Sequence, residues 1–114
     1  MVRLVLGIHN HQPVGNFDHV FEKAHQLAYG PFLNALERHP HVKVSLHCTG
    51  PLWEWLEARR PEYLERVEAL ARSGRVELMG GAFYEAVLAA VPEVANGSGG
   101  LRRFNPLRFG AARV

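Results

Sequence analysis

Residues 4–13 of the chain read Leu4-Val5-Leu6-Gly7-Ile8-His9-Asn10-His11-Gln12-Pro13. The apolar first half of this stretch is typical of a largely buried strand, which we place at Arg3–Ile8. The second half sets two histidines, two amides and a proline directly after that strand. Ligands bind at the carboxyl ends of the strands in parallel sheets and barrels, so we expect this stretch to line a binding site.

Two further strands follow, each separated from the one before by helical patterns. Val42–His47 alternates with period two, and Arg75–Met79 is a short apolar run followed by two glycines. Between the first two strands, apolar residues at helical spacing predict a helix that begins near Phe17, is capped by Asn16 and is broken at Gly30-Pro31, followed by a short helix that ends at His39-Pro40. Between the second and third strands, they predict a helix after Thr49-Gly50-Pro51. A further helix is predicted over Glu62–Ser73, with Pro61 at its start and Gly74 as its C-cap. The order β-α-β-α-β with long crossovers predicts an α/β fold with parallel strands.

The composition is that of one ordinary globular domain. The chain has 114 residues, of which 47% are hydrophobic and 21% charged, and its formal net charge of +2 does not favour nucleic acid or an acidic membrane surface as a partner. Cys48 is the only cysteine, which excludes an intramolecular disulfide and a thiolate metal cage. No apolar run reaches the length of a signal peptide core or a membrane span, so we expect no membrane partner and a cytoplasmic location.

The sequence divides near residue 92. The β-α-β-α-β pattern is consistent over residues 1–92, whereas residues 93–114 contain a Gly/Ser-rich run, after which the chain has four arginines and no acidic residue. Asn105-Pro106 would interrupt a helix in this segment. We therefore expect residues 93–114 to form a poorly ordered tail.

Polar side chains share one parity of the three predicted strands. His9 and His11 extend the first strand, His47 ends the second and Glu77 lies in the third. These four side chains could surround a single pocket, although His47 could equally be a buried structural histidine, and a buried Glu77 would need a polar partner. The other histidines, His19, His25, His39 and His41, are predicted to be surface residues, and Trp53 and Trp55 are predicted to pack in the core and at its rim.

Two functional alternatives follow from the residues alone. In an extended strand, His9 and His11 point the same way and could share a metal ion in a hydrolase or deacetylase-like site, with His47 or Glu77 as a further ligand. The sequence contains no second His/Asp motif that supports such a site. The other alternative is a small, non-catalytic βαβ module that binds a partner.

Two motifs give the chain a resemblance to a known family. His9-Asn10-His11-Gln12-Pro13, taken with the segment Gly74–Glu85, resembles glycoside hydrolase family 57, and most closely its 4-α-glucanotransferase and α-amylase-type members. Asn16-Phe17, Gly50-Pro51-Leu52 and Pro61–Leu64 are similar to the same family, so the resemblance covers roughly residues 1–92.

The resemblance implies the first part of an incomplete (β/α) barrel of seven strands that acts on α-1,4-glucans with retention of configuration. It implies a glutamate nucleophile and an aspartate acid/base on later strands, and no obligatory metal or organic cofactor. Neither catalytic carboxylate matches a residue of this chain, so we expect no catalytic residue here. The resemblance places His11 and Glu77 at substrate-binding positions with His9 beside them, and Glu85 matches the second glutamate of the motif. His47 is a further candidate substrate-binding residue, because of its position at the end of the second predicted strand.

The chain departs from the family pattern at its end. The family has a proline where this chain has Ala86, and an acidic helix leading to the nucleophile where this chain has residues 93–114. We therefore expect the chain to be the product of a frameshifted or truncated reading of a longer gene. We expect this product to bind an α-glucan or maltooligosaccharide and to be inactive alone. Three strands also leave open sheet edges, which favour self-association.

Overall fold

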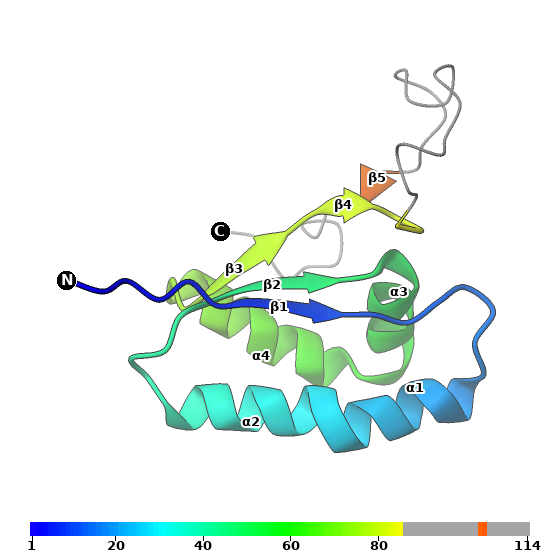
Figure 1. Ribbon diagram of the computed structural model, residues 1–114. Coiled ribbons are helices and arrows are strands. Elements are labelled where there is room, and N and C mark those ends of the chain that lie inside the picture. The colour runs from blue at the N-terminus through cyan, green and yellow to red at the C-terminus, as the bar shows by residue number, and fades with distance from the viewer. Residues whose placement is uncertain (86–102, 105–114) are drawn as a thin grey trace, which may run out of the picture.

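The computed structural model describes residues 1–85 and 103–104, and its centre is a three-stranded parallel sheet (Figure 1). The strands are β1 (Gly7–Asn10), β2 (Val44–Cys48) and β3 (Val76–Met79), in the spatial order β1-β2-β3. Both neighbouring pairs run parallel, as the long connections between them require. The predicted β-α-β-α-β order and α/β fold class are therefore confirmed.

Helical segments fill both connections and lie on one side of the sheet (Figure 1). The first connection holds α1 (Asp18–Ala24), the π-helical turn η1 (His25–Tyr29) and α2 (Gly30–Arg38). The second connection holds α3 (Gly50–Arg59) and α4 (Pro61–Arg72). This one-sided cover decides which face of the sheet is apolar and which is available to a ligand.

The covered face of the sheet builds the hydrophobic core. In β2, the residues Val44, Leu46 and Cys48 are buried, whereas Ser45 and His47 on the opposite face are partly exposed. The helices contribute most of the remaining buried side chains, namely Phe21, Tyr29, Leu33, Leu36, Leu52, Trp53, Leu56, Tyr63, Leu64, Val67 and Leu70. Each such aliphatic or aromatic side chain stabilises the fold by about 1.5–3 kcal/mol when it leaves water, which holds the sheet against its helices.

The opposite face of the sheet carries the polar residues in two rows. The strand register places Gly7, Ser45 and Glu77 side by side, and then, two residues further toward the carboxyl ends, His9, His47 and Met79. The predicted parity of the three strands is confirmed, because alternate residues of a strand point to the same face.

The first strand begins later than predicted. β1 starts at Gly7 rather than at Arg3, and Leu4 and Val5 are each 87% exposed. Immediately before the strand, the Leu6 carbonyl oxygen accepts a hydrogen bond from the Ser45 N–H. Apolar, β-branched residues favour a strand, but a strand forms only where a neighbouring strand supplies the hydrogen bonds.

The predicted helix break at Gly30-Pro31 is wrong. Gly30 has helical backbone angles (φ −62°, ψ −53°), and its N–H donates to the His25 carbonyl oxygen, five residues earlier. Pro31 lies in the first turn of α2 and lacks an N–H, which would break a regular α-helix. The wider π turn removes this conflict, so α1, η1 and α2 follow one another without a loop.

The end of α4 agrees with its prediction. Gly74 follows Ser73, the C-cap residue of the helix, and has φ +70°, in the left-handed region that glycine adopts without strain. Its N–H donates to the Ala71 carbonyl oxygen, and the Arg75 N–H donates to that of Leu70. This pair of bonds closes the helix and turns the chain directly into β3.

Beyond β3 the chain forms a short antiparallel pair, β4 (Gly81–Ala82) with β5 (Arg103–Phe104). Apart from β5, the tail predicted for residues 93–114 lies outside the described residues, so the division at residue 92 stays a prediction. Among the described residues, none of the helices has both the length and the apolarity that a membrane crossing requires.

One histidine predicted to be at the surface is instead partly buried. The His25 ring lies 5.3 Å from the Tyr63 ring and 6.1 Å from the Trp55 ring, measured between centroids. Its buried Nδ1 has no hydrogen-bond partner among the described residues. Burial, aided by the nearby Arg60, lowers the pKa of His25 below its usual value. Helical periodicity alone does not show that η1 rotates this side chain toward α4.

We expect the stability of the fold to decrease as the pH falls from 7.5 to 5. The folded-state pKa of His25 is lowered, so the unfolded chain takes up its proton first and the folded state loses free energy relative to it. The loss begins near the unfolded pKa of about 6.5 and ends below the folded pKa. Urea denaturation across this range measures it. His25→Leu should reduce the slope without abolishing it, because burial also lowers the pKa of His47. His41→Leu, at an exposed position, should leave the slope unchanged, and equal slopes in all three proteins would contradict the assignment.

Candidate functional site

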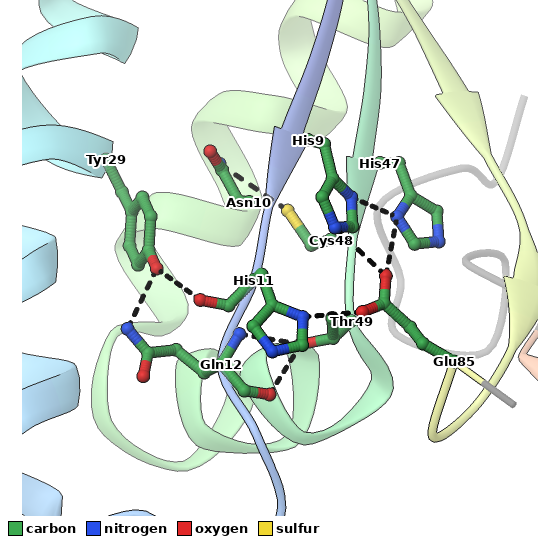
Figure 2. Close-up of polar contacts among 9 residues, drawn as sticks. All are labelled: His9, Asn10, His11, Gln12, Tyr29, His47, Cys48, Thr49 and Glu85. Atoms are coloured by element: carbon green, nitrogen blue, oxygen red, sulfur yellow. Dashed lines mark hydrogen bonds and ion pairs between the residues drawn. The ribbon is translucent and has the colours of Figure 1, made fainter. Parts of the chain in front are cut away.

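Four side chains meet at the carboxyl ends of β1 and β2 on the open face of the sheet (Figure 2). His9 lies in β1, His11 directly follows it, His47 lies in β2 and Glu85 comes from the segment after β4. We call these four residues the histidine–glutamate cluster. His9 and His47 converge because they are paired across β1 and β2. His11 lies two residues after His9, so its side chain points to the same face of the sheet.

The Glu85 carboxylate is the centre of the cluster. Its Oε2 lies 2.5 Å from His11 Nδ1, and its Oε1 lies 3.1 Å from His9 Nε2 and 3.6 Å from His47 Nδ1. His9 Nδ1 is also 2.8 Å from His47 Nδ1. One carboxylate therefore contacts three imidazoles, two of which contact each other.

These contacts define the protons of the neutral cluster. A carboxylate accepts only, so His9 must donate through Nε2 and His11 through Nδ1. A neutral His9 then has an unprotonated Nδ1, which accepts from the Nδ1–H of His47. Burial, and to a smaller extent His9, lower the pKa of His47, while Glu85 opposes this effect. His47 is thus held in the neutral form that this arrangement needs.

Glu85 reaches the cluster from an unusual backbone conformation. Its φ is +54°, in the left-handed region, where residues other than glycine are uncommon. The Glu85 N–H donates to the Ala82 carbonyl oxygen at 3.1 Å, which closes a tight turn. Such a backbone costs on the order of 1–3 kcal/mol and concentrates at functional sites. Here the turn directs the carboxylate toward the three histidines.

A buried polar network fixes the backbone beside His11 (Figure 2). The Thr49 hydroxyl accepts from the Gln12 N–H at 3.1 Å and donates to the Gln12 carbonyl oxygen at 3.0 Å. Gln12 Nε2 donates to the Tyr29 hydroxyl, which in turn donates to the His11 carbonyl oxygen at 3.1 Å. Burial raises the pKa of Tyr29, so its phenol stays protonated and remains a donor. The first connection and the start of α3 together hold the histidine segment in place.

Glu77 lies outside the cluster. It stands in the earlier row of the open face, where the Ser45 hydroxyl donates to its Oε2 at 3.0 Å. The strand register places it beside Ser45 and level with Gly7, two residues short of the level of His9. Glu77 therefore shares the face but not the pocket that sequence parity suggested, and its substrate-binding role stays a prediction.

A cavity of about 190 Å³ adjoins the cluster. It is lined by His11, Gln12, Pro13, Val14, Thr49, Pro51, Tyr84 and Glu85. Tyr84 is 55% exposed and offers an amphipathic ring beside the polar cluster. Sequence reasoning missed Tyr84, although its place next to Glu85 in a Phe-Tyr-Glu motif was the available signal.

Cys48 takes no part in the chemistry of this site. Its side chain is buried on the helix-covered side of β2, and Asn10 Nδ2 donates to its sulfur at 3.7 Å. Burial raises the pKa of Cys48 to about 12, so the thiol is protonated at neutral pH. It is neither a nucleophile nor a thiolate ligand.

The fold and the cluster define an α/β protein whose site lies at the carboxyl edge of parallel strands, the arrangement of β/α barrels. Residues 5–102 match the family model of glycosyl hydrolase family 57, and the chain belongs to this family. The family membership that the two sequence motifs predicted is confirmed, and the match extends ten residues beyond the predicted limit of residue 92.

Named relatives agree with this assignment. The chain is 49% identical over 92 residues to a protein of Pyrococcus furiosus named alpha-amylase, and 47% identical over 92 residues to a 4-alpha-glucanotransferase of Thermococcus litoralis. Each match covers 81% of this chain and 14% of the relative. The crystal structure of a 4-alpha-glucanotransferase from Thermococcus litoralis superimposes with a TM-score of 0.75 at 49% identity, over 77% of this chain and 14% of that one. The chain thus spans about one seventh of the length of these relatives.

Proposed function

We propose that this chain forms part of the α-glucan-binding wall of a family 57 enzyme and binds maltooligosaccharides without cleaving them when alone. The observation that carries the proposal is the histidine–glutamate cluster, which lies beside a cavity on the open face of the sheet. The names of the relatives, alpha-amylase and 4-alpha-glucanotransferase, support an α-glucan as the ligand.

The chemistry of the cluster suits sugar hydroxyls. A hydroxyl donates and accepts at once, and the cluster offers a carboxylate acceptor together with imidazoles that can do either. The ring of Tyr84 also lines the cavity and adds an apolar face. These groups can hold a sugar ring in a fixed orientation.

Bond cleavage requires more than this wall supplies. Retaining glycoside hydrolysis uses two carboxyl groups about 5–5.5 Å apart across the scissile bond. The cluster contains a single carboxylate, and Glu85 is already engaged by three histidines. We therefore assign none of the described residues as nucleophile or acid/base.

The open sheet edges are the second element of the proposal. Among the described residues, β1 and β3 each pair on one side only, with β2. Exposed apolar side chains, including Leu4, Val5 and Met79, accompany these edges. Unpaired edges of this kind associate with further strands, so we propose that they dock against other strands of a barrel or against a second copy.

Calorimetry with maltohexaose tests the proposed glucan wall. We expect the parent chain to bind, and Glu85→Gln and His11→Ala each to weaken the affinity about tenfold, as the loss of one hydrogen bond to a charged group would. Glu57→Gln, which alters an exposed carboxylate on α3, should leave the affinity unchanged.

The same titration decides against the proposal if all four proteins give equal heats. Glu77→Gln tests separately whether the earlier row of the open face joins the subsite. Light scattering of each sample reports self-association through the edges. Release of reducing sugar by the parent chain would contradict the claim that it binds without cleaving.

A further inference from the structure

We propose that His9, His11 and Glu85 form a binding site for a divalent transition-metal ion of the Zn²⁺ type. Each of the three residues offers one ligand atom, and these atoms lie within 4.8 Å of one another. This inference goes beyond glucan binding and stands independently of it.

The donor set selects the class of ion. Two imidazoles and a carboxylate suit Zn²⁺, Co²⁺ or Ni²⁺, whereas Ca²⁺ and Mg²⁺ prefer oxygen ligands alone. Bonds of about 2.0–2.2 Å in a tetrahedral arrangement separate neighbouring ligand atoms by about 3.3 Å. His9 Nε2 lies 3.1 Å from Glu85 Oε1, and His11 Nδ1 lies 2.5 Å from Glu85 Oε2. The three candidate ligand atoms lie within 4.8 Å of one another, so small rotations of the side chains would bring them to the separations of a metal site.

The room for this adjustment exists. The side chains of His9 and His11 are each 51% exposed, and that of Glu85 is 25% exposed. A small rotation of either ring therefore displaces solvent rather than core side chains. The same exposure leaves coordination positions open toward the cavity, as in metal sites that exchange a water or bind a substrate oxygen.

The contact between His9 and His47 prepares His9 as a ligand. A metal ion on His9 Nε2 requires the proton to move to Nδ1, and a ligating histidine almost always donates that second N–H to a neighbouring acceptor. His47 Nδ1, at 2.8 Å, is such an acceptor once its own proton resides on Nε2. The pair thus exchanges tautomers together, which makes His47 a positioning residue rather than a ligand.

The conformation of Glu85 supports the same assignment. Its strained φ of +54° places a carboxylate between two histidines that extend from a single strand end. Glu85 therefore supplies the third ligand that the His9-x-His11 spacing requires, in the position for which the sequence offered only His47 or Glu77.

Titration of the chelator-treated full chain with ZnCl₂ at pH 7.5 tests the site. We expect one ion per chain, and a visible d–d absorption band when Co²⁺ replaces Zn²⁺. Glu85→Gln and His11→Ala should each weaken Zn²⁺ binding at least thirtyfold. His47→Leu should weaken it about tenfold through loss of the acceptor, and His47→Gln, which keeps an acceptor, should recover most of that loss.

Two control variants separate this site from adventitious binding. Glu57→Gln and His41→Leu should retain the parent affinity, because both residues are exposed and neither belongs to the cluster. The absence of stoichiometric binding by the parent chain would overturn the proposal, as would an unchanged affinity in Glu85→Gln. Zn²⁺ binding without maltohexaose binding would uphold the metal site and reject the glucan wall, and the reverse result would do the opposite.

Discussion

Replacing Gly50 by alanine is expected to destabilise the fold by about 1–3 kcal/mol, the usual cost of forcing an extra group into a packed core. A Cβ at this position would lie 2.5 Å from ring atoms of Phe83, whose side chain is only 2% exposed. The Gly50 N–H also donates to the Phe83 carbonyl oxygen at 3.0 Å. Because the ring is buried and the Phe83 backbone is tied to Gly50 by this bond, relief of the clash should shift the segment that carries Glu85.

Urea denaturation measures the loss, and maltohexaose titration measures its effect on the site. Gly7→Ala is the matched control, because a Cβ there meets nothing within 4 Å and Gly7 does not have a left-handed backbone. If Gly50→Ala were as stable as Gly7→Ala, the packing of Phe83 on the start of α3 would not be as described.

Replacing Thr49 by valine should cost about 2–4 kcal/mol, since it leaves two buried backbone groups of Gln12 without partners. The two side chains have nearly the same shape, so the change removes the hydroxyl and little else. Thr49 occupies the position before α3 where such a hydroxyl would ordinarily cap the helix, but no cap hydrogen bond forms. Its hydroxyl instead joins β2 to the segment after β1.

The conservative variant Thr49→Ser keeps the hydroxyl and should retain most of the stability and the glucan affinity. Thermal unfolding of the three proteins compares them directly. Equal losses for Thr49→Val and Thr49→Ser would show that the methyl group, and not the hydrogen-bonded pair with Gln12, supports this part of the fold.

Hydrophobic periodicity, together with proline and glycine at the ends of elements, predicts most of the fold. Alternation in β2 identifies the apolar face, and α4 begins at the predicted Pro61 and ends two residues before Gly74. The errors arise where tertiary context decides. Leu4 and Val5 favour a strand but pair with none of the strands that the structure describes, and Pro31 stays in a helix because a π turn accommodates it.

The candidate site divides in the same way. Strand parity brings His9, His11 and His47 together, because it depends only on the period of an extended chain. The place of Glu85 depends on a left-handed turn and on the docking of Phe83 against Gly50, neither of which a strand pattern contains. Strand parity also predicted that Glu77 lies close to these histidines, because parity gives the face of the sheet but not how far along its strand each residue lies.

The π turn at His25–Tyr29 also has a consequence for insertions and deletions. Each residue of an α-helix advances the side-chain direction by about 100°, so removing one residue to restore a regular helix would rotate everything beyond it by that amount. Tyr29 would turn away from Gln12, and Leu33 and Leu36 would leave the core. The extra residue of the π turn therefore sets the rotation of α2 relative to α1. A change of length there would also disturb the histidine segment, because Tyr29 donates to the His11 carbonyl oxygen.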